Sequence, residues 1–147
     1  MRLTKLEAAD YRNIAHAVLE AGPELTVICG ENGQGKTNLL EAVWLLTGSK
    51  SFRGAKDAEL IGQHAPLARL QGETESAGMK KEIRITVANA QPGMKKGRTA
   101  QVNGVDYGRA TAIAGIFTAV VFEPGHLTLV KGSPEGRRRF IDAALCQ

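Results

Sequence analysis

Aromatic residues are scarce in this sequence, and cysteines are scarcer. Phe, Trp and Tyr make up 5% of the 147 residues, so we expect a core of aliphatic side chains and alanine. The only two cysteines, Cys29 and Cys146, lie far apart, and no metal-ligand spacing surrounds either of them. This usage is typical of reduced thiols in a cytosolic protein rather than of a disulfide framework.

The sequence also lacks a long apolar run, an internal repeat and a low-complexity tract. Its charged, alternating start, MRLTKLEAADYRN, does not resemble a signal peptide, so we expect a cytoplasmic protein without a membrane partner. The chain is long enough for one domain with its own core. Its net charge of +4 permits contact with nucleic acid but does not indicate it.

One segment carries a definite chemistry: GENGQGKT, at residues 30–37, matches the pattern G-x-x-x-x-G-K-S/T. The apolar run LTVICG at 25–30, which we expect to be a buried strand, precedes it. A helix is expected to follow, because Leu39, Leu40, Val43, Trp44 and Leu46 recur at helical spacing, with Trp44 toward the core and Gly48 as a stop. Strand, glycine-rich loop and helix in this order are typical of a P-loop that binds a phosphate chain.

The residue types in the loop predict individual roles. Lys36 can reach the β- and γ-phosphates, and the Thr37 hydroxyl can bind Mg²⁺. Asn32 either hydrogen-bonds a phosphate or caps the turn, and Asn38 is expected near the α-phosphate through its backbone N–H. The predicted nucleotide-binding residues of the loop are Gly30, Glu31, Asn32, Gly33, Gln34, Gly35, Lys36, Thr37 and Asn38.

Hydrolysis requires a second acidic group, which usually follows an apolar strand. The run FTAVVF at 117–122 is a second expected buried strand, but only Glu123 follows it, and Pro124 comes next instead of a second acid. Glu123 is therefore either a ligand of Mg²⁺ or water, or an ordinary acid at the end of a strand. The catalytic residue stays unassigned, and we expect this chain to bind ATP weakly or incompletely and to hydrolyse very little by itself.

The rest of the sequence predicts a small antiparallel sheet and a last helix. Alternation of polar and apolar residues, with Pro-Gly and Asn-Gly turns, marks the strands at 67–75, 80–90 and 98–107, and shorter candidates at 2–9 and 17–20. We expect a loop or short helix at 51–66 and a short helix at 107–115. Ser133, Pro134 and Glu135 form a helix start. No stop signal follows before Gln147, so we expect the chain to end inside this helix.

Several stretches resemble the RecF family of DNA-repair ATPases, which is related to SMC and ABC-type heads. They are LTKLEAADYRNI at 3–14, GENGQGKTNLLEAVWLL at 30–46, KSFRGAKDAELI at 50–61 and LTLVKGSPEGRRRFID at 127–142. The sequence departs from the family pattern at Tyr11, where Phe is common, and at Pro124–Gly125, where Pro-Glu or Pro-Asp is common. A Q-loop glutamine is not evident.

The resemblance implies an α/β fold: a P-loop ABC-type ATPase lobe with parallel core strands and an antiparallel β-rich subdomain, truncated. Residues 1–147 would be the N-terminal part of a RecF-like head, without the signature motif, Walker B strand and D-loop that a full RecF adds. By position in related heads, Arg12 and Asn13 lie near the nucleotide. Arg12 is then either a phosphate or adenine contact or a solvated residue at the end of a strand.

The resemblance also implies a function, an ATP- and Mg²⁺-dependent role in recombinational DNA repair, replication and the SOS response. ATP would close a homodimer on gapped or junction DNA, single-stranded and double-stranded, and help load recombinase with a RecR-type mediator. The full-length protein would be a weak DNA-dependent ATPase. Two other readings remain open: a P-loop kinase or transferase acting on a small molecule, and a nucleotide-sensing adaptor without turnover.

Two basic clusters are candidates for contact with DNA. The run Arg137–Arg139 lies on the expected last helix, where consecutive residues point about 100° apart, so the three cannot share one groove. Its members either contact DNA phosphate or serve the fold, and Arg138 or Arg139 can pair with Asp142. Lys95, Lys96 and Arg98 form the other cluster, either a solvated loop or a contact with DNA.

Overall fold

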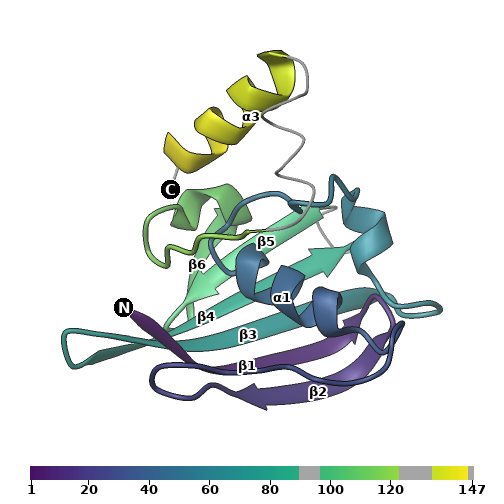
Figure 1. Cartoon of the computed structure of the whole chain (residues 1–147), viewed down its shortest axis with the longest axis horizontal. Coiled ribbons are helices and arrows are strands. Elements are labelled where there is room, and N and C mark those ends of the chain that lie inside the picture. The colour runs from purple at the N-terminus through teal and green to yellow at the C-terminus, as the bar shows by residue number, and fades with distance from the viewer. Residues whose placement is uncertain (90–96, 123–133, 146–147) are drawn as a thin grey trace.

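A six-stranded antiparallel sheet forms the centre of the protein (Figure 1). The computed structural model describes residues 1–89, 97–122 and 134–145. Within these residues the strand order is β2-β1-β3-β4-β5-β6, and each neighbouring pair is antiparallel. The strands are β1 (Arg2–Tyr11), β2 (Ile14–Glu20), β3 (Leu67–Ser76), β4 (Met79–Ala88), β5 (Gly97–Val102) and β6 (Val105–Arg109).

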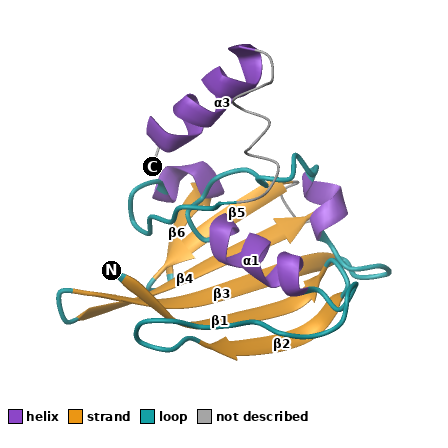
Figure 2. Cartoon of the chain, viewed as in Figure 1, coloured by secondary structure: helices purple, strands orange, loops and turns teal. Residues whose placement is uncertain are grey.

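The helices lie outside this sheet, and α1 packs against one of its faces (Figure 2). They are α1 (Lys36–Leu45), α3 (Pro134–Leu145) and two short 3₁₀ helices, η1 (Asp57–Leu60) and η2 (Ala110–Ile113). Among the described residues, none of the helices is long and apolar enough to cross a membrane.

The core follows from the two-residue alternation of the strands. Leu6 and Ala8 of β1 face the same side as Ile83 and Ile85 of β4, and α1 covers them with residues such as Leu45. The buried side chains of the described residues are almost all aliphatic or alanine, with Tyr11 and Phe117 as the aromatic members. The expectation of an aliphatic core is therefore confirmed.

The turn residues Asn103 and Gly104 determine the hairpin between β5 and β6. Asn103 and Gly104 have φ values of 50° and 79°, which is the backbone that a two-residue hairpin turn requires. Val102 and Val105 pair directly on either side of this turn. The Asn-Gly turn and the antiparallel pairing predicted for 67–75, 80–90 and 98–107 are confirmed, and residues 2–9 and 17–20 form the β1–β2 hairpin. The Pro-Gly turn lies outside the described residues.

Two predicted buried strands are not strands in the structure. The segments 25–30 and 117–122 lie outside the six strands of the sheet. Several of their large apolar side chains face solvent, with exposed fractions of 78% for Leu25, 97% for Val120 and 79% for Phe122, whereas Phe117 is buried. An apolar run becomes a buried strand only beside another strand, which satisfies its backbone N–H and C=O groups. Neither segment has such a neighbour among the described strands.

The boundaries of two predicted helices also change. At 107–115 the predicted short helix is present only as the 3₁₀ helix η2 (Ala110–Ile113), because β6 continues to Arg109. The last helix is confirmed from Pro134 onward, whereas Ser133 lies outside the described residues. On this helix Arg138 Nε lies 3.9 Å from Asp142 Oδ2, as expected for an i,i+4 pair.

The orientation of α1 differs from the prediction. The predicted helix is present and already begins at Lys36, inside the motif, but Leu40 is 53% exposed and Trp44 is only partly buried. The indole Nε1 of Trp44 donates to Lys50 O at 2.8 Å, and its ring meets Phe52 edge to face. Glu41, Ala42 and Leu45 are the buried residues, so a carboxylate occupies a position on the inner face of α1.

Gly48 is the residue at which the chain leaves α1, and we expect its replacement by alanine to destabilise the fold. Gly48 has a φ of 84°, its N–H donates to Leu45 O at 3.0 Å, and an added Cβ would collide with the carbonyl oxygen of Ala110. Positive φ costs an alanine about 1–2 kcal/mol, and overpacking adds about 1–3 kcal/mol.

Gly78 is the matched control, because its φ is 77° and nothing lies within 4 Å of an added Cβ. Urea unfolding of Gly48→Ala and Gly78→Ala measures the difference between the two sites. Equal losses of unfolding free energy would show that the collision with Ala110 is relieved without cost.

Candidate phosphate-binding site

The loop at 30–37 delivers the chain to the N-terminus of α1. Gly35 precedes the helix with a φ of 96°, and Leu39 N donates to Gly35 O at 2.9 Å, which is the first bond of α1. A Cβ at position 35 would lie 3.0 Å from Asn13 Oδ1, so glycine is needed here for close approach as well as for conformation. Free N–H groups at such a helix start attract anions.

A cavity of about 260 Å³ lies over this helix start. Two of its residues are cations, Lys36 and Arg53, and among the described residues that line it none is acidic. The lining residues are Asn32, Gly33, Gly35, Lys36, Thr37, Asn38 and Arg53. The structure thus brings together six of the predicted loop residues, while Gly30, Glu31 and Gln34 do not line the cavity.

The ammonium group of Lys36 lies across the glycine-rich loop. Its Nζ donates to Gly30 O at 2.7 Å and to Glu31 O at 2.6 Å. Thr37 is exposed at the cavity, so its hydroxyl is accessible to a ligand. No group of three or more His, Cys, Asp or Glu side chains in the described part of the chain is placed to hold a metal ion.

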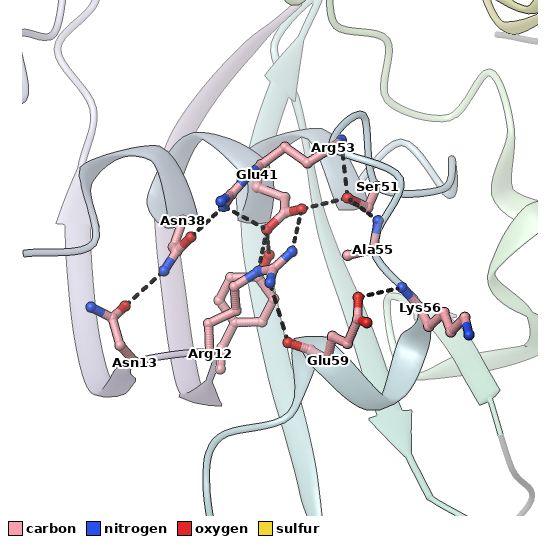
Figure 3. Close-up of polar contacts among 10 residues, drawn as sticks. Arg12, Asn13, Asn38, Glu41, Ser51, Arg53, Ala55, Lys56 and Glu59 are labelled. Carbon is pink, nitrogen blue, oxygen red and sulfur yellow. Dashed lines mark hydrogen bonds and ion pairs between the residues drawn. The ribbon is translucent and has the colours of Figure 1, made fainter. Parts of the chain in front are cut away.

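Arg53 is a lining residue that the sequence analysis did not single out. It comes from the turn after α1, and its Nη1 donates to Asn38 Oδ1 at 2.8 Å (Figure 3). The same nitrogen lies 3.9 Å from Glu41 Oε2, and the side chain is 41% exposed. The signal available in the sequence was a basic residue inside the segment 50–61. Only the path of the chain around α1 shows that this residue returns to the loop.

Arg12 and Asn13, the two residues that the family resemblance implies, lie differently. Asn13 reaches the loop: its Nδ2 donates to Gly33 O at 2.9 Å, and its Oδ1 accepts from Asn38 Nδ2 at 2.7 Å. Arg12 turns to Glu41 instead and does not line the cavity (Figure 3). Contact of either residue with a nucleotide stays a prediction.

Glu41 is a fully buried carboxylate on α1. Its Oε2 accepts from Tyr11 Oη at 2.7 Å and from Arg12 Nε at 2.6 Å. Its Oε1 accepts from Arg12 Nη2 at 2.8 Å and from Ser51 Oγ. The forked contact with Arg12 is the strong, bidentate kind of ion pair. A charge removed from water needs this degree of pairing.

These contacts decide the protonation states around Glu41. Burial raises the pKa of the Glu41 carboxyl, but hydrogen bonds from Arg12, Ser51 and Tyr11 outweigh burial, so its pKa lies below the ordinary value. The pKa of Arg12 is raised, chiefly by its hydrogen bond to Glu41. The pKa of Tyr11 is raised, first by burial and then by Glu41. At neutral pH the pair is therefore charged and the phenol is neutral.

Of the basic cluster formed by Lys95, Lys96 and Arg98, the structure describes only Arg98. Arg98 is not a loop cation, because its side chain is 8% exposed, its Nε lies 2.9 Å from Asp57 Oδ1 and its Nη1 donates to Ser49 O. It connects β5 to the segment after α1, so the prediction of a solvated Arg98 is wrong, whereas its contact with DNA stays a prediction. Lys95, Lys96 and Glu123 lie outside the described residues.

Comparison with known proteins assigns the chain to a family. The family model for the RecF/RecN/SMC N terminal domain matches residues 2–124. The DNA replication and repair protein RecF of Staphylococcus carnosus is 40% identical over 147 residues, which are 100% of this chain and 38% of that protein. RecF of Anaeromyxobacter sp. is 44% identical over 144 residues, 98% of this chain and 37% of that protein.

Solved structures agree with the sequence matches. The recombination mediator protein RecF with ATP, of the RecFOR pathway, has a TM-score of 0.86 and 32% identity, and the match covers 98% of this chain and 39% of that one. The corresponding RecF–ATPrS structure has a TM-score of 0.88 and 29% identity, covering 99% and 38%. The SMC head domain of Thermotoga maritima shares the fold, with a TM-score of 0.59 and 24% identity over 80% of this chain and 43% of that one.

The fold class is thereby confirmed as that of an ABC-type ATPase head, in truncated form. The chain spans about 38% of the length of the RecF proteins it matches. A family model covers most of the chain, and RecF relatives match across its whole length. The chain therefore belongs to the RecF/RecN/SMC N-terminal domain family, and within it to the N-terminal part of RecF.

Proposed function

We propose that this chain is the nucleotide-binding part of a RecF-type DNA replication and repair protein and that its cavity binds the phosphates of ATP. The observation that carries the proposal is the cavity at the start of α1, into which the loop brings Lys36 and Arg53. The cavity has two cationic side chains, no acidic residue in its described lining, and the N-terminus of a helix beside it. These features suit a polyphosphate ligand. The RecF structures with ATP and ATPrS, which this chain resembles, support the same ligand.

The residues present fit a nucleotide with its metal ion. Lys36 would neutralise the β- and γ-phosphates, and backbone N–H groups from Gly33 to Thr37 would hold phosphate oxygens. Thr37 would supply a hydroxyl ligand to Mg²⁺, and the ion would help to neutralise the charge of the phosphates. Arg53, the other cation that lines the cavity, would contact the same phosphates.

The chain also exposes surface that suits a larger assembly. Leu25 and Val27 in one segment, and Val120 and Phe122 in another, are large apolar side chains that face solvent. The curated relatives are longer than this chain. We propose that further residues of such a head pair with both segments as the parallel strands expected from the sequence, because strand pairing would bury the apolar side chains.

For the complete protein we propose ATP-dependent homodimerisation on gapped or junction DNA, with a RecR-type mediator and loading of recombinase. The energetic logic is linkage: ATP that binds the closed dimer more tightly than the monomer shifts the equilibrium toward the dimer by that difference in affinity. The relatives named as DNA replication and repair proteins support this role.

Calorimetry with Mg·ATP, Mg·ADP and AMP tests the nucleotide site. We expect ATP and ADP to bind and AMP to bind at least about tenfold more weakly, because AMP has no β-phosphate for Lys36. The experiment uses this chain and, in parallel, a chain of the length of its RecF relatives. Equal binding of AMP and ATP, or no binding of ATP to either chain, would refute the site.

The longer chain also separates the candidate functions. Sedimentation with and without ATP on gapped DNA is expected to show an ATP-dependent dimer. Transfer of phosphate to a small acceptor would instead support a kinase or transferase. Binding without turnover or dimerisation would support a nucleotide-sensing adaptor.

A further inference from the structure

Glu41 joins parts of the protein that are distant in sequence. It lies on α1, one helical turn after Thr37, and its side chain is fully buried. Its partners come from the end of β1 and from the turn after α1. The turn after α1 also supplies Arg53 to the lining of the cavity, and Asn13, two residues after β1, contacts the glycine-rich loop.

The first connection runs through Ser51 to Arg53. Ser51 Oγ donates to Glu41 Oε1 and also accepts from the backbone N–H groups of Arg53 at 3.1 Å and Ala55 at 3.3 Å. The carboxylate thus orients the hydroxyl, and the hydroxyl holds the backbone that carries Arg53. The guanidinium of Arg53 then extends past Glu41 to Asn38 at the cavity.

The second connection runs through Arg12 to Asn13. Arg12 has a φ of 51°, a backbone conformation that a non-glycine residue adopts only when its surroundings hold it. The fork to Glu41 and the bonds from Arg12 N to Leu60 O and from Arg12 Nη1 to Glu59 O hold this turn. The next residue, Asn13, donates to Gly33 O inside the glycine-rich loop.

We propose that Glu41 is a positioning residue for the phosphate cavity: through Ser51 it places Arg53, and through Arg12 it places Asn13 and the loop. Glu41 itself does not line the cavity, and Arg12 has its charge balanced by Glu41. Glu41 therefore acts on phosphate binding only through Arg53, which lines the cavity, and through Asn13, which contacts the loop. The part of this inference that concerns nucleotide affinity rests on the proposed function, whereas the placement of the two segments does not.

Amide hydrogen exchange of the nucleotide-free protein tests the placement. In Glu41→Gln, we expect exchange at the backbone N–H groups of Arg53 and Ala55 and across residues 31–35 to accelerate more than exchange in β4, which reports the general loss of stability. Glu75→Gln is the matched control, because it breaks another Arg–Glu pair, Arg2 Nη2 to Glu75 Oε2 at 2.7 Å, away from the cavity. The proposal would be overturned if exchange at Arg53 and Ala55 and across residues 31–35 accelerated no more than exchange in β4.

A double-mutant cycle of Ser51 and Arg53 tests the consequence for ATP binding. This test does not depend on whether Glu41→Gln folds. Ser51→Ala is expected to weaken Mg·ATP binding about three- to tenfold, and to have almost no effect when Arg53 is already alanine. If Ser51 has a purely structural role, the losses of binding free energy in Ser51→Ala and Arg53→Ala should add in the double variant. Such additivity would overturn the connection to Arg53. Absence of ATP binding by the wild-type chain would refute the proposed function, while the exchange result would still decide the placement.

Discussion

Lys36→Ala is expected to abolish measurable binding of Mg·ATP, with an affinity at least about 100-fold lower than that of the wild type, or about 2.7 kcal/mol. The side chain is the one predicted to meet the β- and γ-phosphates, where a charge-assisted hydrogen bond forms in a partly enclosed cavity. Arg53, the other described cation that lines the cavity, does not replace it, because its guanidinium already donates to Asn38 Oδ1. Calorimetry with Mg·ATP measures the loss.

The fold should survive this change. The bonds of Lys36 Nζ are made to the exposed carbonyl groups of Gly30 and Glu31, which water can also satisfy. Lys50→Ala is the matched control: it removes the same charge from an exposed lysine nearby that does not line the cavity. ATP affinity in Lys36→Ala equal to that of Lys50→Ala would contradict the assignment of the loop.

Glu41→Ala is expected to have the largest effect on stability, a loss of about 3–5 kcal/mol of unfolding free energy. The substitution removes the acceptor of Tyr11 Oη, Arg12 and Ser51 Oγ at once and leaves the buried phenol without its partner. Tyr11→Phe is the matched smaller change, because it removes one hydrogen bond and should cost about 1 kcal/mol. Urea unfolding at neutral pH measures both, and equal losses would show that the Arg12–Glu41 pair adds nothing.

The pH dependence of this stability has a definite sign. The folded pKa of Glu41 is lowered from 4.5, so folding favours the ionised carboxylate. The stabilisation is fully present above about pH 4.5 and is lost as pH falls through the lower, folded pKa. The difference in unfolding free energy between wild type and Glu41→Gln should therefore be largest near neutral pH and shrink below pH 4.5. Carboxylates common to both proteins cancel in this difference, and a gap that is constant from neutral to acid pH would contradict the lowered pKa.

Local chemistry explains which elements could be predicted. The glycine-rich loop and the start of α1 at Lys36 depend on residues within a few positions of one another. The Asn103–Gly104 turn and the helix from Pro134 are local in the same sense. Such signals act through backbone conformations that only certain residues readily adopt. The local structure that they predict therefore depends little on residues elsewhere in the chain.

The failures concern residues whose environment comes from elsewhere in the chain. Hydrophobicity marked 25–30 and 117–122 as buried strands, but a strand needs a neighbour, and the described sheet provides none beside them. Helical spacing identified α1 and placed Trp44 inward, whereas the sheet receives Ala42 and Leu45. Arg98 looked like a loop cation, and its bonds to Asp57 and Ser49 draw it into the protein.

The sequence by itself determined the glycine-rich loop, the antiparallel hairpins and the family, because each depends on short motifs in a fixed order. The tertiary structure alone decided that Arg53 joins the cavity, that Arg12 turns away from it and that Glu41 connects the two. Burial is the reason. A carboxylate on a helix is unremarkable in water, but once the sheet covers it, its charge must be paired, and the partners it then holds lie far away in the sequence.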